Sequence, residues 1–183
     1  MKLSDGEKLI LIMLSEMYEK QNIDGDNTDP KFIQEAIFSG NTWGIPWKYC
    51  GIPFEDNKTP DEVTEVVDIL DMWYFIEESY ATLSDEDKGV VEKEAKPFGK
   101  DPKFKGFDGN NEPQIGIARF LIEQLNRFTN FKNRDLNSHM PSIDTYRRMF
   151  SVFEPMRQTL TGNLLTADQL IEILNAKTHP DYR

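Results

Sequence analysis

The chain has 183 residues, with 32 acidic and 21 basic side chains and a formal net charge of −11. This length suits one domain with a core of its own. Phosphate groups repel so acidic a chain, so we expect it to bind neither nucleic acid nor an anionic membrane surface directly. Lys96, Lys100, Lys103 and Lys105 form the densest basic run, which we interpret as a solvated loop.

Cysteine usage and the start of the chain point to a cytoplasmic protein. Cys50 is the sole cysteine, so no disulfide can form within the chain, which fits a reducing compartment. The apolar run Leu9–Leu14 is flanked by acids and followed by no cleavage-site pattern, unlike a signal peptide. No stretch approaches the ~20 apolar residues of a membrane span.

The first predicted helix covers Leu9 to Tyr18 and follows a capping box, Ser4 to Glu7. Ile10, Met13, Leu14 and Met17 share one face at helical spacing, while Leu11 and Tyr18 lie on another. This excess of apolar surface can face either the core or a second subunit. We therefore expect a homo-oligomer.

A second helix is predicted from Lys31 to about Ser39, because Asp29 and Pro30 are typical of a helix start. The following segment, 41–57, is irregular and rich in aromatic residues. Its two tryptophans, Trp43 and Trp47, either pack into the core or face a partner.

The longest predicted helix runs from Thr59 to Leu83 and becomes apolar around its whole circumference in its second half. Thr59 is its predicted cap, Pro60 its first residue and Glu62 a capping-box acid. We expect the other helices to pack around it. Its acids Asp68 and Asp71 are expected to face either the loop Gly106–Glu112 or the arginines at 147 and 148.

The remaining periodic segments also predict helices, and no segment alternates as a strand does. They span 84–95, 112–131, 141–153 and 166–176, with Pro155 ending or kinking the third. The expected fold class is all-α: a single multihelical domain of roughly seven or eight helices around the central helix at about residues 59–83.

The loop after the first helix has partial calcium-site spacing. Asp24, Asp26, Thr28 and Glu35 occupy loop positions one, three, five and twelve of the calcium motif. Asp29 stands where the motif needs glycine, so we interpret this segment as an acidic loop before a capped helix.

A second polar loop, Gly106–Glu112, is the main candidate ligand-binding site. Asp108 and Glu112 can act as acid, base or cation ligands, and Asn110 and Asn111 supply amides beside a predicted helix start. The same side chains can equally serve as turn and cap residues.

Two further residues are candidates for this site. His139 can act as a base if it folds near the loop, although a structural histidine is the alternative. Arg147 can lie near it as well. No second histidine has ligand spacing, and no phosphate loop or dinucleotide fingerprint is present, so we expect no metal and no cofactor.

Several short motifs, taken in order, resemble the YfbU family of uncharacterised bacterial proteins, from Leu3 to about Leu174. They are Leu9–Leu11, Val66–Met72, Gly106–Glu112, Arg119–Leu121, Asn137–His139 and Tyr146–Met149. The resemblance implies a helical fold and no established activity. Some relatives are joined to helix-turn-helix modules, which implies a ligand-sensing or regulatory role.

Two functions follow as hypotheses. The first is a cytoplasmic protein-interaction or regulatory binding domain that self-associates, and the second is a small-molecule-binding or hydrolytic domain with its site at Gly106–Glu112. Whether the protein is an enzyme stays open, and a protein or a small molecule can be its ligand.

Overall fold

The structure is a computed structural model that describes residues 1–21, 28–55, 58–179 and 181. Every regular element within these residues is helical, which confirms the all-α class. A short π-helical turn and a 3-10 turn accompany the α-helices. The α-helices are α1 (Asp5–Lys20), α2 (Pro30–Phe38), α3 (Gly44–Lys48), α4 (Asp61–Thr82), α5 (Asp85–Glu94), α6 (Gln114–Arg119), α7 (Ile143–Arg157) and α8 (Ala167–Asn175).

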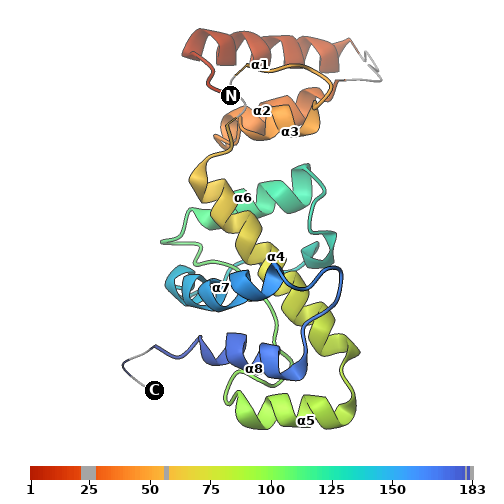
Figure 1. Ribbon diagram of the computed structural model, residues 1–183. Coiled ribbons are helices and arrows are strands. Elements are labelled where there is room, and N and C mark those ends of the chain that lie inside the picture. Colours follow the sequence, from red (N-terminus) through yellow and green to blue (C-terminus); the bar gives the residue numbers. More distant parts are fainter. Residues whose placement is uncertain (22–27, 56–57, 180, 182–183) are drawn as a thin grey trace.

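The helices are stacked along α4 (Figure 1). The first three form one end of the molecule, where α1 packs chiefly on α2. From there α4 runs through the molecule towards α5 at the opposite end, while α6, α7 and α8 pack along it. The chain thus starts and finishes at different levels of the stack, and α1 lies farthest from α5.

The central position of α4 is confirmed, with buried residues on several sides in its second half. Met72, Trp73 and Ile76 are at most 1% exposed. Its predicted first residue, Pro60, is wrong by one residue: the helix begins at Asp61, and no side chain caps it. The hydroxyl of Thr59 instead accepts a hydrogen bond from the indole of Trp47, at 3.3 Å.

The aromatic segment after α2 packs onto the core, although five of its residues form the short helix α3. Trp43 is buried, and its ring meets those of Trp47 and Phe120 at centroid distances of 5.2 and 5.4 Å. The indole N–H of Trp43 donates to Asn41 Oδ1 at 2.9 Å. Core packing therefore accounts for Trp43 and most of Trp47.

The helix predicted over 112–131 is much shorter in the structure. α6 ends at Arg119 and continues as a π-helical turn, Phe120–Gln124, in which Leu125 N–H donates to the Phe120 carbonyl. Asn126 and Phe128 then adopt left-handed backbone angles, with φ of 51° at each. A right-handed helix cannot pass through such residues, so the apolar periodicity outlasts the helix.

The last two helices agree more closely with the predictions made from the sequence. α7 continues past Pro155 to Arg157 rather than stopping there. α8 starts with the predicted capping box between Thr166 and Gln169, and α1 with the one between Ser4 and Glu7. Across the described parts of the chain, no helix has the length and apolar character that crossing a bilayer requires.

Candidate functional site

The loop Gly106–Glu112 lies against the segment that precedes α7. Phe107 N–H donates to the Leu136 carbonyl at 2.9 Å, and Ser138 N–H donates to the Phe107 carbonyl at 3.0 Å. Gly106 has φ of 86°, and a Cβ there would clash with the Leu136 carbonyl. Only glycine suits this combination of backbone angle and close approach.

Glu112 is the helix cap of α7 rather than of the helix that follows it in sequence. Its Oε1 accepts the N–H groups of Ser142 and Ile143 at 2.6 and 2.7 Å. Its Oε2 accepts Asp108 N–H at 2.7 Å and the Ser142 hydroxyl at 2.6 Å. Burial opposes ionisation, but these hydrogen bonds outweigh it and hold the pKa of Glu112 below its ordinary value.

Asp108 and its neighbours form a tight turn. Asp108 Oδ2 accepts the Asn111 side-chain amide at 2.6 Å, and Oδ1 accepts Asn110 N–H at 3.0 Å. These two bonds lower the pKa of Asp108, and the charge of His139 adds to the effect. Both carboxylates are therefore ionised and already bonded to the protein, an arrangement that serves turn and cap geometry rather than proton transfer.

His139 lies near this loop but does not bond to it through its imidazole. Its backbone N–H donates to Asn137 Oδ1, which also accepts Gly109 N–H, each at 2.9 Å. The imidazole is exposed, with Nε2 3.7 Å from Asp135 Oδ2. The structure thus brings His139, Asp108 and Glu112 to one region, while their role as a ligand site stays a prediction.

Arg147 does not join them. Its Nε lies 2.7 Å from Glu65 Oε1 on α4, and its Nη1 lies 3.0 Å from Asp144. It lines a different groove, of about 410 Å³, with Asp61 and Glu154. The structure therefore assigns Arg147 to an ion-pair network between α4 and α7.

The acids of α4 have a partner that the sequence did not indicate. Arg157 Nη1 lies 2.8 Å from Asp68 and 3.3 Å from Asp71, instead of either acid facing Gly106–Glu112 or the arginines at 147 and 148. Burial raises the pKa of Asp71, and the guanidinium counteracts this only in part. The two acids hold α7 against α4.

An ion pair between buried Glu77 and exposed Arg134 was not identified from the sequence. Glu77 is 7% exposed, and its two oxygens accept the two guanidinium nitrogens of Arg134 at 2.8 Å each. Glu77 Oε1 also accepts Phe104 N–H at 2.8 Å. The available signal was the acidic pair Glu77 and Glu78 within the apolar second half of α4, but nothing in the sequence identified the partner of Glu77.

The partial calcium motif cannot be assessed as a whole, because Asp24 and Asp26 lie outside the described residues. Asp29 is described: it caps α2 by accepting Phe32 N–H at 3.0 Å, and it pairs with Lys48 at 2.6 Å. Within the described ranges, no three His, Cys, Asp or Glu side chains are grouped so as to hold a metal ion.

A cleft of about 620 Å³ opens beside Gly106–Glu112, between α7 and the end of α8. We call it the Lys177 cleft; its lining includes Phe98, Lys105, His139, Ser142, Tyr146 and Lys177. His139 was singled out from the sequence, whereas both lysines were missed. Lys105 was assigned to a solvated loop, and Lys177 follows the last predicted helix, where no periodicity marks its neighbours.

Comparison with known proteins agrees with the sequence motifs. The model of the YfbU domain matches residues 1–176. A UPF0304 protein of Methanocaldococcus jannaschii is 32% identical over 117 residues, which cover 61% of this chain and 65% of that protein. That relative is archaeal, and the expectation of a bacterial protein stays a prediction. Because the family model covers nearly the whole chain, this protein belongs to the YfbU family.

Proposed function

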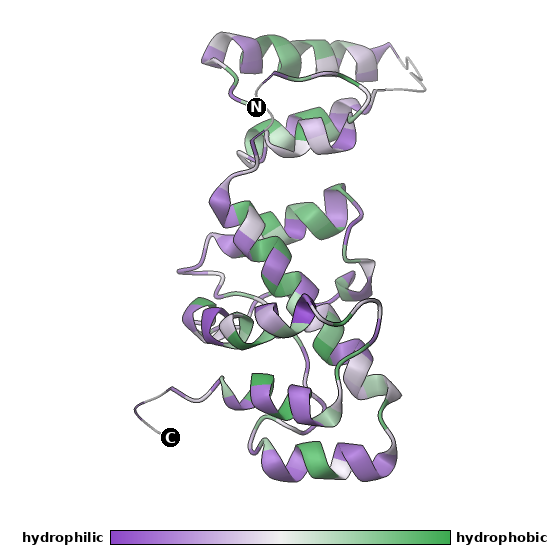
Figure 2. Cartoon of the chain, viewed as in Figure 1, coloured by the Kyte–Doolittle hydropathy of each residue, from purple (hydrophilic) through white to green (hydrophobic). Residues whose placement is uncertain are grey.

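We propose that the protein is a self-associating interaction domain in which two copies pair through the outer face of α1. This face consists of six large apolar side chains that are between 38% and 59% exposed: Leu9, Ile10, Met13, Leu14, Met17 and Tyr18. Figure 2 shows how much of α1, at the edge of the molecule, is hydrophobic. This exposed face is the observation that carries the proposal.

The apolar character of α1 points away from the rest of the molecule. A surface helix ordinarily buries its apolar stripe and presents polar residues to water. In α1 the only buried residue is Ser15, which lies on the side opposite the exposed stripe. Ile10, Met13, Leu14 and Met17 follow the i, i+3, i+4, i+7 spacing of a helix that packs on another helix.

The apolar surface continues beyond the helix. A groove of about 480 Å³ lies between α1, α2 and the segment after α3, and Ile10 belongs both to this groove and to the outer face of α1. Ile52, another lining residue, is 53% exposed. A stable dimer buries at least about 1,200 Å² in total, and groove and helix together offer a wider surface than a single helix does.

A second copy is the occupant that the charges favour. A two-fold axis perpendicular to α1 places the same patch on both subunits and sets the two α1 helices antiparallel. The acidic first turn of one copy, with Asp5 and Glu7, then lies near the last turn of the other, which carries Lys20. The two helix dipoles also oppose each other in this arrangement, which is favourable.

Light scattering over protein concentrations of about 1 to 100 µM tests the proposal. The natural chain should reach the mass of a dimer, and Met13→Glu should stay monomeric, because it places a charge at the centre of the buried face. Val90→Glu is the matched control, since Val90 is 41% exposed on α5, at the other end of the molecule. A natural chain that is monomeric throughout, or a Met13→Glu variant that still dimerises, would refute the proposal.

A further inference from the structure

The lining of the Lys177 cleft differs in charge from the rest of the protein. The chain carries a formal charge of −11, yet none of the described residues that line this cleft is an aspartate or a glutamate. Its basic side chains are Lys105, His139 and Lys177. A cleft that gathers positive charge in an acidic protein is built to attract a negative group.

The half-buried ammonium group of Lys177 lies over two aromatic rings and near a second lysine. Its Nζ lies 5.4 Å from the ring centroid of Trp73 and 4.9 Å from that of Phe98. No carboxylate of the described residues lies within 4 Å of this nitrogen. Burial, followed by the nearby charge of Lys105, lowers the pKa of Lys177. An ammonium group that has no carboxylate of the described residues near it, and that faces a cleft beside a second lysine, would gain from an anion.

Hydrogen bonds from Arg148 fix the backbone at Lys177. Arg148 donates from Nη2 to the carbonyl of Lys177 at 3.0 Å and from Nε to that of Ala176 at 3.4 Å. The guanidinium thereby satisfies carbonyls at the end of α8. The ammonium group is therefore presented to the cleft by a positioned residue, which reduces the entropy lost when a ligand binds.

Tyr146 contributes a fixed aromatic surface to the cleft. Tyr146 is buried, and its hydroxyl donates to the Gly106 carbonyl at 2.9 Å. Burial raises the pKa of Tyr146, so this surface stays uncharged. The ring of Phe98, with the Lys177 Nζ 4.9 Å from its centroid, is a second aromatic surface in the lining. A ligand in this cleft therefore meets positive charge next to aromatic surface.

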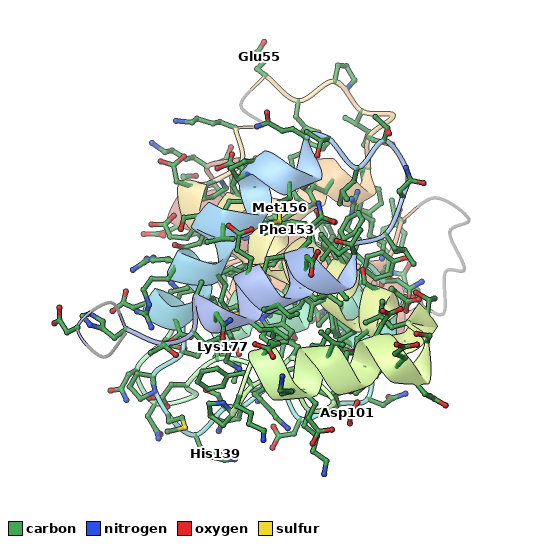
Figure 3. All side chains as sticks on the ribbon, turned by 60° about the horizontal axis from the view of Figure 1, so that its bottom comes forward. Glu55, Asp101, His139, Phe153, Met156 and Lys177 are labelled. Carbon is green, nitrogen blue, oxygen red and sulfur yellow. The ribbon has the colours of Figure 1, made fainter. Side chains whose placement is uncertain are left out.

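We propose that the Lys177 cleft binds a small organic anion. Its carboxylate or phosphate group lies at Lys177 and Lys105, and its apolar part lies against Phe98 and Tyr146. Figure 3 shows the side chains of Lys177 and His139 on the same side of the molecule. This inference does not depend on self-association, because α1 lies at the other end of the stack.

Calorimetric titration with four probes tests the charge and the apolar part separately. Phenyl phosphate and benzoate carry the two anionic groups, benzyl alcohol is the neutral analogue, and inorganic phosphate lacks the apolar part. We expect at least one aromatic anion to bind about tenfold or more tighter than benzyl alcohol, because a charged hydrogen bond has that magnitude. It should also bind about tenfold or more tighter than inorganic phosphate, because only the aromatic probe buries apolar surface. The anion that binds more tightly identifies the charged group.

Lys177→Met removes the charge and keeps a side chain of similar length over the two rings. Binding of the aromatic anion should weaken about tenfold or more, because the charged donor is lost. The melting temperature of the free protein should change little, because the loss of two cation–π contacts offsets the removal of a desolvated charge. Lys100→Met changes net charge equally outside the cleft and should alter binding by less than about twofold. Absence of binding by both aromatic anions, equal binding of benzyl alcohol or inorganic phosphate, or unchanged binding by Lys177→Met would overturn the inference.

Discussion

At the scale of single residues, hydrogen-bond donors distinguish a structural acid from a ligand-binding one. Asp108 and Glu112 have the residue types and the loop setting of a site. In the structure four donors converge on Glu112, and three of them belong to Ser142 and Ile143 at the start of α7. The sequence does not show how many hydrogen-bond donors will surround a given carboxylate. A helix-capping acid therefore cannot be distinguished from a ligand-binding acid before the fold is known.

The environment of Glu112 predicts a pH-dependent stability. Its folded pKa lies below its unfolded value of roughly 4.3, so its contribution is present above that value and is lost as the pH falls through the folded pKa. Glu112→Gln should lower the free energy of unfolding by about 2 to 3 kcal/mol near neutral pH, because every contact is a donor and the new amide NH₂ must face one.

Urea unfolding between about pH 7 and pH 3 measures this effect. The difference between the natural chain and Glu112→Gln should shrink at the acid end. Glu172→Gln is the control, since Glu172 is exposed on α8, and it should change stability by less than about 0.5 kcal/mol. A constant difference at all pH values would show that the ionised form of Glu112 is not what stabilises α7.

At the scale of elements, local signals predict where helices start better than where they stop. The capping boxes of α1 and α8 are complete within four residues, and both were predicted correctly. The helix over 112–131 was overextended because its apolar spacing persists through the π-helical turn and the left-handed Asn126 and Phe128. These backbone angles depend on packing between elements, and the local sequence pattern carries no information about that packing.

The contact between Gly106 and Leu136 predicts opposite effects for two glycine substitutions. Gly106→Ala should destabilise the protein by at least about 2 kcal/mol for two reasons. The left-handed φ is strained for alanine, and the added Cβ would clash with the backbone of Leu136. Gly116→Ala is the matched control on α6, where a Cβ meets nothing within 4 Å, and it should stabilise by about 0.5 to 1 kcal/mol. Thermal or urea unfolding of both variants measures the contrast, and equal effects would contradict it.

At the scale of the whole molecule, ion pairs between distant segments connect α4 to the later part of the chain. Arg134 pairs with Glu77, and Arg157 with Asp68 and Asp71, across 57, 89 and 86 residues of sequence. The apolar periodicity of α4 predicted that other helices cover it, and they do. The periodicity could not predict these ion-pair partners, because pairing over such sequence separations follows from the topology of the fold. Together these contacts hold α4 to α7 and to the segment before it, and α1 takes no part in them.

This difference between α1 and α4 predicts how local stability depends on protein concentration. In a monomer α1 is held mainly by α2, so its amides should exchange with solvent faster than those of α4, which is packed by α6, α7 and α8. If two copies pair through the outer face of α1, exchange in α1 should slow as concentration rises from about 1 to 100 µM, because association stabilises the folded form by mass action. Hydrogen exchange read by mass spectrometry on peptides from both helices measures this. Met13→Glu should abolish the concentration dependence in α1 and leave α4 protected; slow, concentration-independent exchange in α1 of the natural chain would instead mean that α2 alone is enough to hold it.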